Sequence, residues 1–168
     1  NLGHYQPTVL EKVQRLEQQG EDIVHFEIGD PDFNTPRHII EAAYASMLDG
    51  ETHYTSSMGL HDLRAAAREA TAFSRGFTPS PDQVLVTPGA NIIVYLAVKC
   101  LVNPGEEVIF PDPGFPTYHS AIKLCGAVPV RVPLREENLF RMSPGDIERA
   151  ATRKTRLIII NSPNNPTG

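Results

Sequence analysis

The sequence predicts a three-layer α/β/α fold with a mostly parallel sheet, preceded by an N-terminal arm. From residue 79 onward, short runs rich in β-branched residues alternate with stretches of helical periodicity, as in parallel strands joined by helical crossovers. The last run, 157–160, is Leu-Ile-Ile-Ile, which suits a strand buried on both faces of a parallel sheet. Several runs stop abruptly in loops rich in Gly, Pro and Asn, which predicts a loop-bearing edge of the sheet.

The first part of the chain predicts three helices and one short strand. Apolar residues recur at helical spacing, and Gly20 and Gly50 end the first two helices. The third helix is rich in alanine, and the strand shows only weak alternation. We expect helices at residues 8–19, 36–49 and 60–73 and a strand at 23–28. A boundary near residue 35 divides the chain into an N-terminal arm, 1–35, which is part of a small domain, and the start of a large domain, 36–168.

The rest of the chain alternates regularly between strand and helix. We expect strands at residues 84–86, 108–110, 128–132 and 157–160, and helices at 90–101, 117–124 and 144–151. Because parallel strands end at the same edge of a sheet, the loops that follow them converge there. Three such loops, at 87–91, 111–116 and 161–168, therefore predict a pocket.

Composition excludes several classes of function. The chain has 168 residues, 40% hydrophobic and 21% charged, with a net charge of −5, and it lacks the basic run that a nucleic-acid surface needs. No apolar segment approaches the roughly 20 residues of a membrane span. The six histidines show no metal-ligand spacing. Cys100 and Cys125 lie in apolar helical patterns, so we expect reduced core thiols and a cytoplasmic location.

The first loop, Thr87-Pro-Gly-Ala-Asn91, opens a predicted helix, whose unpaired N–H groups and positive dipole end form a phosphate-binding site. The same residues are also an ordinary way to begin a helix. In the second loop, Phe115 is either a flat aromatic wall or a core residue that caps the next helix. In the third, Asn165 is either an amide donor or a turn former before proline. These alternatives stay open on the residues alone.

Taken together, the motifs resemble the class I/II aminotransferases, the aspartate aminotransferase-like family of fold-type I enzymes that depend on pyridoxal 5′-phosphate (PLP). The resemblance covers essentially the whole chain, but the chain ends where the family pattern is less than half complete. It is carried by Gly29-Asp-Pro-Asp-Phe33, Tyr54 with Gly59-Leu60, Thr87-Pro-Gly-Ala90, Pro111-Asp-Pro-Gly-Phe-Pro116 and Asn161-Ser-Pro-Asn-Asn-Pro-Thr-Gly168.

The resemblance implies roles for the residues of the three loops. Gly89, Ala90 and Asn91 form part of the cup for the cofactor phosphate. Phe115 stacks on the pyridine ring, where many relatives have Tyr or Trp. Asn165 bonds the ring oxygen O3′ and contacts the substrate. The peptide bonds before Pro113 and Pro166 are expected to be cis.

Two residues outside these loops also match the family. Tyr54 corresponds to the tyrosine that reaches across a homodimer to the phosphate of the partner's cofactor; alternatively, it is a surface tyrosine. Gly29 corresponds to a glycine whose backbone lies beside the substrate carboxylate; alternatively, it is a plain turn glycine. The likeness also implies that strand 157–160 lies between strands supplied by later chain, so that both of its edges lack partners here.

The implied function is transfer of an amino group between an amino acid and a 2-oxo acid. The family's Schiff-base lysine, its acid facing the pyridine nitrogen and its substrate-binding arginine all follow the Asn-Pro-Thr-Gly loop. The lysines present match none of them, so we expect no catalytic residue in this chain and no transamination by the chain alone. Two alternatives remain: a PLP-dependent C–S lyase or decarboxylase of the same fold, and a non-catalytic regulatory or interaction module. The lysines are Lys12, Lys99, Lys123 and Lys154.

Overall fold

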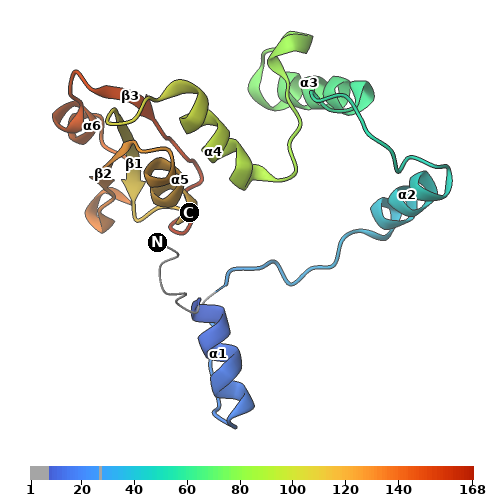
Figure 1. Cartoon of the computed structure of the whole chain (residues 1–168), viewed down its shortest axis with the longest axis horizontal. Coiled ribbons are helices and arrows are strands. Elements are labelled where there is room, and N and C mark those ends of the chain that lie inside the picture. Colours follow the sequence, from blue (N-terminus) through green and yellow to red (C-terminus); the bar gives the residue numbers. More distant parts are fainter. Residues whose placement is uncertain (1–7, 27) are drawn as a thin grey trace. The chain divides into compact units, whose positions relative to one another are not determined.

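The computed structural model describes residues 8–26 and 28–168, which divide into two compact units between Tyr54 and Thr55. The described part of the first unit contains α1 (Val9–Gln18) and α2 (Arg37–Leu48), and the second unit begins with α3 (His61–Arg75) (Figure 1). The three predicted helices are thus confirmed. Within the described ranges, no helix is both long and apolar enough to cross a membrane.

Two predicted strands of this region are wrong. Residues 23–26 and 28 form no strand, and Glu27 lies outside the described residues. Residues 84–86 also form no strand, although the Val86 N–H donates to the Met58 carbonyl at 3.1 Å. The Val84 carbonyl instead accepts from the Arg64 guanidinium of α3 at 3.0 Å. The backbone of this run thus bonds to one carbonyl and to one side chain, and not to a second strand. Composition typical of a strand did not suffice here, because β propensity depends on packing against neighbouring strands.

The sheet of the second unit has three parallel strands in the order β2-β1-β3. They are β1 (Glu107–Asp112), β2 (Val128–Pro133) and β3 (Thr155–Ile158). In the register, Ile109 of the central strand is opposite Val130 on one side and Ile158 on the other. The expectation that both edges of the last strand lack partners is therefore wrong, because one edge of β3 pairs with β1. The strand also lies two residues earlier than predicted.

Helices cover the sheet, as the predicted fold class requires. Val108 and Phe110 of β1 pack against α4 (Ala90–Leu101) and α5 (Thr117–Leu124) in one core cluster. Ile109 alternates to the opposite face and is also fully buried, as is Val132 of β2. Another helix, α6 (Pro144–Ala150), contacts β2. The described sheet is thus the layered, parallel α/β arrangement that the alternating pattern predicted.

The strand order fixes where a ligand can bind. The chain runs from β1 through α5 to β2 on one side of β1, and then through α6 to β3 on the other side (Figure 1). The connections therefore diverge at β1. In open α/β sheets, ligands bind in the crevice beyond the carboxyl ends of the strands at such a switch point. Here the loops that follow β1 and β3 form the walls of that crevice.

Candidate functional site

A cavity of about 250 Å³ lies at this switch point. The start of α4 forms one wall, the loop after β1 and the first turn of α5 form the second, and the loop after β3 forms the third. Four of the residues singled out in the sequence therefore meet in one place, and three further residues join them. The lining comprises Ala90, Asn91, Val94, Phe115, Tyr118, Asn161 and Asn165.

The first wall is the N-terminus of α4. Gly89 is the N-cap residue, with φ of +87°, a conformation that strongly favours glycine. The Thr87 hydroxyl donates to the Gly89 carbonyl at 3.1 Å, and the Gly89 N–H donates to the Thr87 carbonyl at 2.8 Å. No side chain caps the helix. No side-chain acceptor therefore occupies the first-turn amides, including those of Ala90 and Asn91. Such a helix N-terminus suits an anion.

The second wall is aromatic. Phe115 is half-buried and lies beside Tyr118, with ring centroids 5.9 Å apart and an interplanar angle of 72°. Tyr118 is only 6% exposed, and burial raises the pKa of its phenol above the ordinary value of 10.0, so it stays neutral at pH 7. Tyr118 was not among the site residues predicted from the sequence. The available signal was its place three residues after Phe115, in the first turn of the helix predicted at 117–124.

Side-chain hydrogen bonds tie the three loops together. The Thr117 hydroxyl donates to Asn91 Oδ1 at 3.3 Å and so joins the second loop to the first. Asn164 Nδ2 donates to the Pro113 carbonyl at 3.2 Å and to the Thr167 hydroxyl at 2.8 Å. Asn164 is 9% exposed, whereas Asn165, which lines the cavity, is exposed. Asn164 thus fastens the third loop against the second, a role that the sequence analysis did not give it.

Backbone geometry in these loops agrees with two further expectations. The Asp112–Pro113 and Asn165–Pro166 peptide bonds are both cis, as the resemblance implied. A third cis bond, Ser162–Pro163, was not expected.

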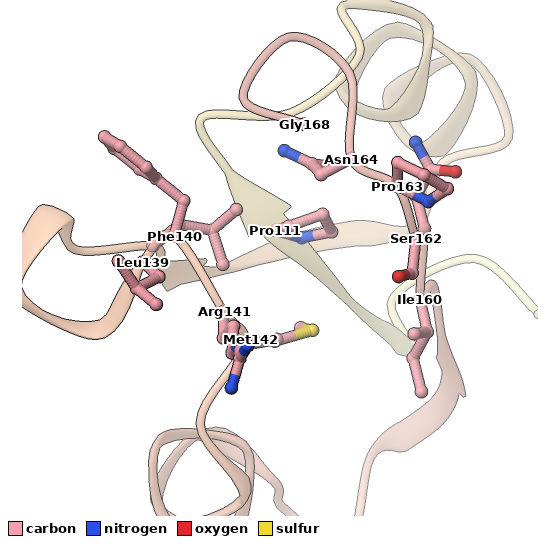
Figure 2. A pocket seen from close by; sticks show the side chains of 12 residues that line it. Pro111, Leu139, Phe140, Arg141, Met142, Ile160, Ser162, Pro163, Asn164 and Gly168 are labelled. Carbon is pink, nitrogen blue, oxygen red and sulfur yellow. The ribbon is translucent and has the colours of Figure 1, made fainter.

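A larger hollow of about 480 Å³ lies nearby, between residues 139–142 and the chain from Ile160 to Gly168. Figure 2 shows Leu139 and Phe140 on one side of Pro111, with Ile160 on the other side. None of the predicted site residues lines this hollow. The smaller cavity, rather than this one, is therefore the candidate site.

Two of the predicted site residues lie outside the unit that contains the cavity. Gly29 and Tyr54 belong to the first unit, where Gly29 is exposed and Tyr54 is fully exposed. None of the four lysines lines the cavity. Of the two cysteines, Cys125 is buried, as expected of a core thiol, but Cys100 is exposed on α4, so that expectation is wrong for Cys100.

An uncapped helix N-terminus, a flat aromatic wall and a side-chain amide at a switch point form a cavity whose chemistry suits a phosphorylated aromatic ligand. Comparison with known proteins is more specific. Residues 21–168 match the family model of aminotransferase class I and II, and the chain belongs to this family. Its fold is that of the fold-type I aminotransferases, and the class I and II aminotransferases of this fold use PLP.

Relatives with different substrates are similar to this chain. It is 40% identical over 160 residues, 95% of its length, to the aspartate aminotransferase of Geobacillus stearothermophilus. It is 42% identical over 151 residues, 90% of its length, to an arginine–pyruvate transaminase of Pseudomonas aeruginosa. A solved single mutant of Thermus thermophilus aspartate aminotransferase matches with a TM-score of 0.90 and 34% identity, over 98% of this chain and 44% of that one. The chain spans only 41% and 38% of the two curated relatives.

The cavity fits PLP on chemical grounds. The first turn of α4 offers amide donors to the phosphate, Phe115 offers a flat surface to the pyridine ring, and Asn165 offers an amide donor to the phenolic oxygen. All three features face the same cavity. The donor set therefore agrees with the cofactor that the family uses.

Proposed function

We propose that this chain is the cofactor-binding, amino-terminal part of a PLP-dependent aminotransferase. The whole protein would transfer an amino group between an amino acid and a 2-oxo acid. The observation that carries the proposal is the single cavity into which Ala90, Asn91, Phe115 and Asn165 converge from three loops. The mixture of aspartate and arginine–pyruvate transaminases among similar proteins supports the reaction type and leaves the amino acid open.

In this proposal, the residues of the cavity bind the cofactor and orient its ring. Ala90 and Asn91 hold the phosphate through backbone amides at the positive end of α4, and Gly89, whose own N–H donates to the Thr87 carbonyl, forms the turn of the phosphate cup before them. Phe115 covers one face of the ring, and Asn165 donates to the phenolic oxygen. When bound, PLP supplies an electron sink that lets an amino acid lose its Cα proton. Because no lysine lines the cavity, these residues by themselves bind the cofactor without catalysing transfer.

The remaining roles rest on the family resemblance. We assign Tyr54, which is fully exposed, to the cofactor phosphate of a second copy in a homodimer. Gly29 and Asn165 are assigned to the substrate. The division into an N-terminal arm, 1–35, and a large domain, 36–168, belongs to the same proposal, as does a cytoplasmic location, with which two free cysteines are compatible.

Calorimetric titration of the 168-residue chain with 4-deoxypyridoxine 5′-phosphate tests the proposal. This compound keeps the ring and the phosphate but has no aldehyde to react with surface lysines. We expect saturable binding of one molecule per chain. Deoxypyridoxine without the phosphate should bind at least about tenfold more weakly, because it forgoes the hydrogen bonds to the first turn of α4.

Two matched variants make the test specific for the cavity. Asn165→Ala should weaken binding of the phosphorylated compound by about tenfold, since one hydrogen bond to the ligand is lost. Asn34→Ala changes an exposed asparagine in the first unit and should leave binding unchanged. If the wild-type chain is folded and does not bind the phosphorylated compound, or if both variants bind as it does, the proposed site is wrong.

A further inference from the structure

Tyr118 connects the hydrophobic core to the cavity. It lies in the first turn of α5, is only 6% exposed, and yet lines the cavity. Its ring makes an edge contact with buried Phe110, at a centroid distance of 6.5 Å and an angle of 71°. On the other side it makes a similar contact with Phe115, at 5.9 Å and 72°. The three rings form a continuous row from strand β1 to the cavity wall.

Phe115 needs support of this kind because it lies on a loop. Gly114 precedes it at a point where an added Cβ would collide with the Pro111 carbonyl oxygen, so the loop folds tightly there. The Tyr118 N–H donates to the Phe115 carbonyl at 3.0 Å, which fixes the backbone of Phe115. That bond does not fix the plane of the Phe115 ring. The neighbouring ring of Tyr118 meets it edge-to-face, an arrangement whose energy depends on the mutual angle of the two rings.

We propose that Tyr118 is a positioning residue whose ring sets the plane of Phe115 for stacking on the aromatic ligand of the cavity. The inference deepens the proposed function and rests on it. The hydroxyl of Tyr118 makes no hydrogen bond to any other residue that the structure describes, and an edge contact with Phe115 does not require it. The ring alone should therefore suffice, which separates the effects of two substitutions.

The experiment compares Tyr118→Leu with Tyr118→Phe in the 168-residue chain, using 4-deoxypyridoxine 5′-phosphate and inorganic phosphate as ligands. Tyr118→Leu removes the aromatic edge and should weaken binding of the ring compound by about two- to tenfold. Binding of phosphate alone should stay unchanged, since it uses the amides of α4. Tyr118→Phe keeps the edge and should bind both ligands as the wild type does.

A double-mutant cycle with Phe115→Leu tests whether Tyr118 acts through Phe115. In the Phe115→Leu background, Tyr118→Leu should cost nothing further. A Tyr118→Leu protein that binds the ring compound as the wild type does, or that loses the same factor with and without Phe115, overturns the inference. Equal weakening for both ligands also overturns it, because it marks a general loss of structure.

A readout without ligand separates this inference from the proposed function. In the unliganded chain, nuclear Overhauser contacts should join the rings of Phe115 and Tyr118, and Tyr118→Leu should shift the ring resonances of Phe115 while Tyr118→Phe leaves them nearly in place. If these ring effects are seen but the wild-type chain binds no ring compound, the proposed function fails. If the chain binds and the ring effects are absent, Tyr118 does not position Phe115.

Discussion

Asn164 and Asn165 are adjacent and chemically identical, yet the structure gives them opposite surroundings. Asn164 is buried and donates to the Pro113 carbonyl, 51 residues earlier in the chain, whereas Asn165 is exposed at the cavity. The sequence assigned a ligand role to Asn165 through a family resemblance and gave Asn164 no ligand role. No local pattern distinguishes the two, because the partner of Asn164 lies in a distant loop.

We predict that Asn164→Ala destabilises the chain by about 1–3 kcal/mol, because it leaves the Pro113 carbonyl and the Thr167 hydroxyl without this donor. Asn165→Ala is the matched control and should change the free energy of unfolding by less than about 0.5 kcal/mol, since its side chain is exposed. Urea unfolding measures both values. Equal effects at the two positions would show that Asn164 does not fasten the loops.

Asp146 makes the stability of the second unit depend on pH. A hydrogen bond from Arg135, with Nη1 2.7 Å from Oδ2, and a further contact with Arg149 hold the pKa of Asp146 below its ordinary value of 3.8. Because the folded state has the lower pKa, this stabilisation is complete above the unfolded value and is lost as the pH falls through the lowered one.

We therefore predict that Asp146→Asn lowers the melting temperature at pH 7, and that the difference from the wild type narrows once the pH falls below about 4. Thermal melts between pH 7 and pH 2 measure this. Asp32→Asn, at an exposed position in the first unit, should leave the melting temperature close to that of the wild type throughout. A difference for Asp146→Asn that stays constant down to pH 2 would exclude the ion pair as its cause.

At the scale of elements, helices were easier to predict than strands. Each helix carries its own periodicity and end signals, such as the capping box between Thr8 and Glu11 of α1. A strand needs a partner, which the local pattern does not show. The run at 84–86 has the composition of a strand, but in the described structure its backbone bonds to Met58 and to Arg64 instead. The strand predictions for β1, β2 and β3 were correct in kind because β2 and β3 each pair with β1.

The segment at 84–86 is held by a close approach to Gly59. This glycine has φ of +97°, and an added Cβ would lie 2.7 Å from the Cβ of Val86. We predict that Gly59→Ala costs about 2–4 kcal/mol, from backbone strain and from the clash together. Gly76→Ala is the matched control, since φ is +75° there and no atom lies within 4 Å of the added Cβ, so only the strain of about 1 kcal/mol remains.

The Val86 amide donates to the Met58 carbonyl, so its hydrogen exchange reports whether Val86 keeps its place beside Gly59. Exchange should accelerate in Gly59→Ala and stay unchanged in Gly76→Ala. Equal acceleration in the two variants would mean that strain alone, and not the contact with Val86, sets the cost.

For the whole molecule, the sequence predicted that three loops meet at one cavity, but it did not predict which buried residues hold them there. The alternation of strands and helices was sufficient to predict that the loops after β1 and β3 share one edge, because parallel strands share a polarity. It does not account for the first loop, which joins them at the cavity although residues 84–86 form no strand. Tyr118 and Asn164 were missed, since their importance depends on burial and on partners in other loops. The order of the strands was also mistaken at β3, which pairs with β1.

The two outer strands of the described sheet differ in how well their edges are protected. The strand β2 contains Pro129 and Pro133, and proline discourages pairing with another chain. The strand β3 contains no proline, and Ile158 and Ile160 near its end are 42% and 73% exposed. We therefore expect the 168-residue chain to self-associate through β3 and to be marginally stable as a monomer.

Sedimentation velocity of Ile158→Lys tests this expectation. The substitution should shift the chain toward the monomer, because a charge on an edge strand opposes pairing. Val128→Lys, in β2, is the matched control, since Val128 is 43% exposed, and it should leave the association unchanged. A wild-type chain that is monomeric and melts cooperatively in the usual mesophile range would contradict the expectation.

The central position of β1 has a consequence for synthesis on the ribosome. The strand β2 follows β1 after one helix, whereas β3 does not begin until Thr155, after α6 has also been made. A nascent chain that has emerged only as far as α6 therefore leaves one side of β1 without its hydrogen-bonding partner, while Asn165 is still inside the exit tunnel. The candidate cavity can form only after the loop at 161–168 has left the exit tunnel. Completion of this sheet and formation of the cavity thus depend on the same stretch of chain, residues 155–165.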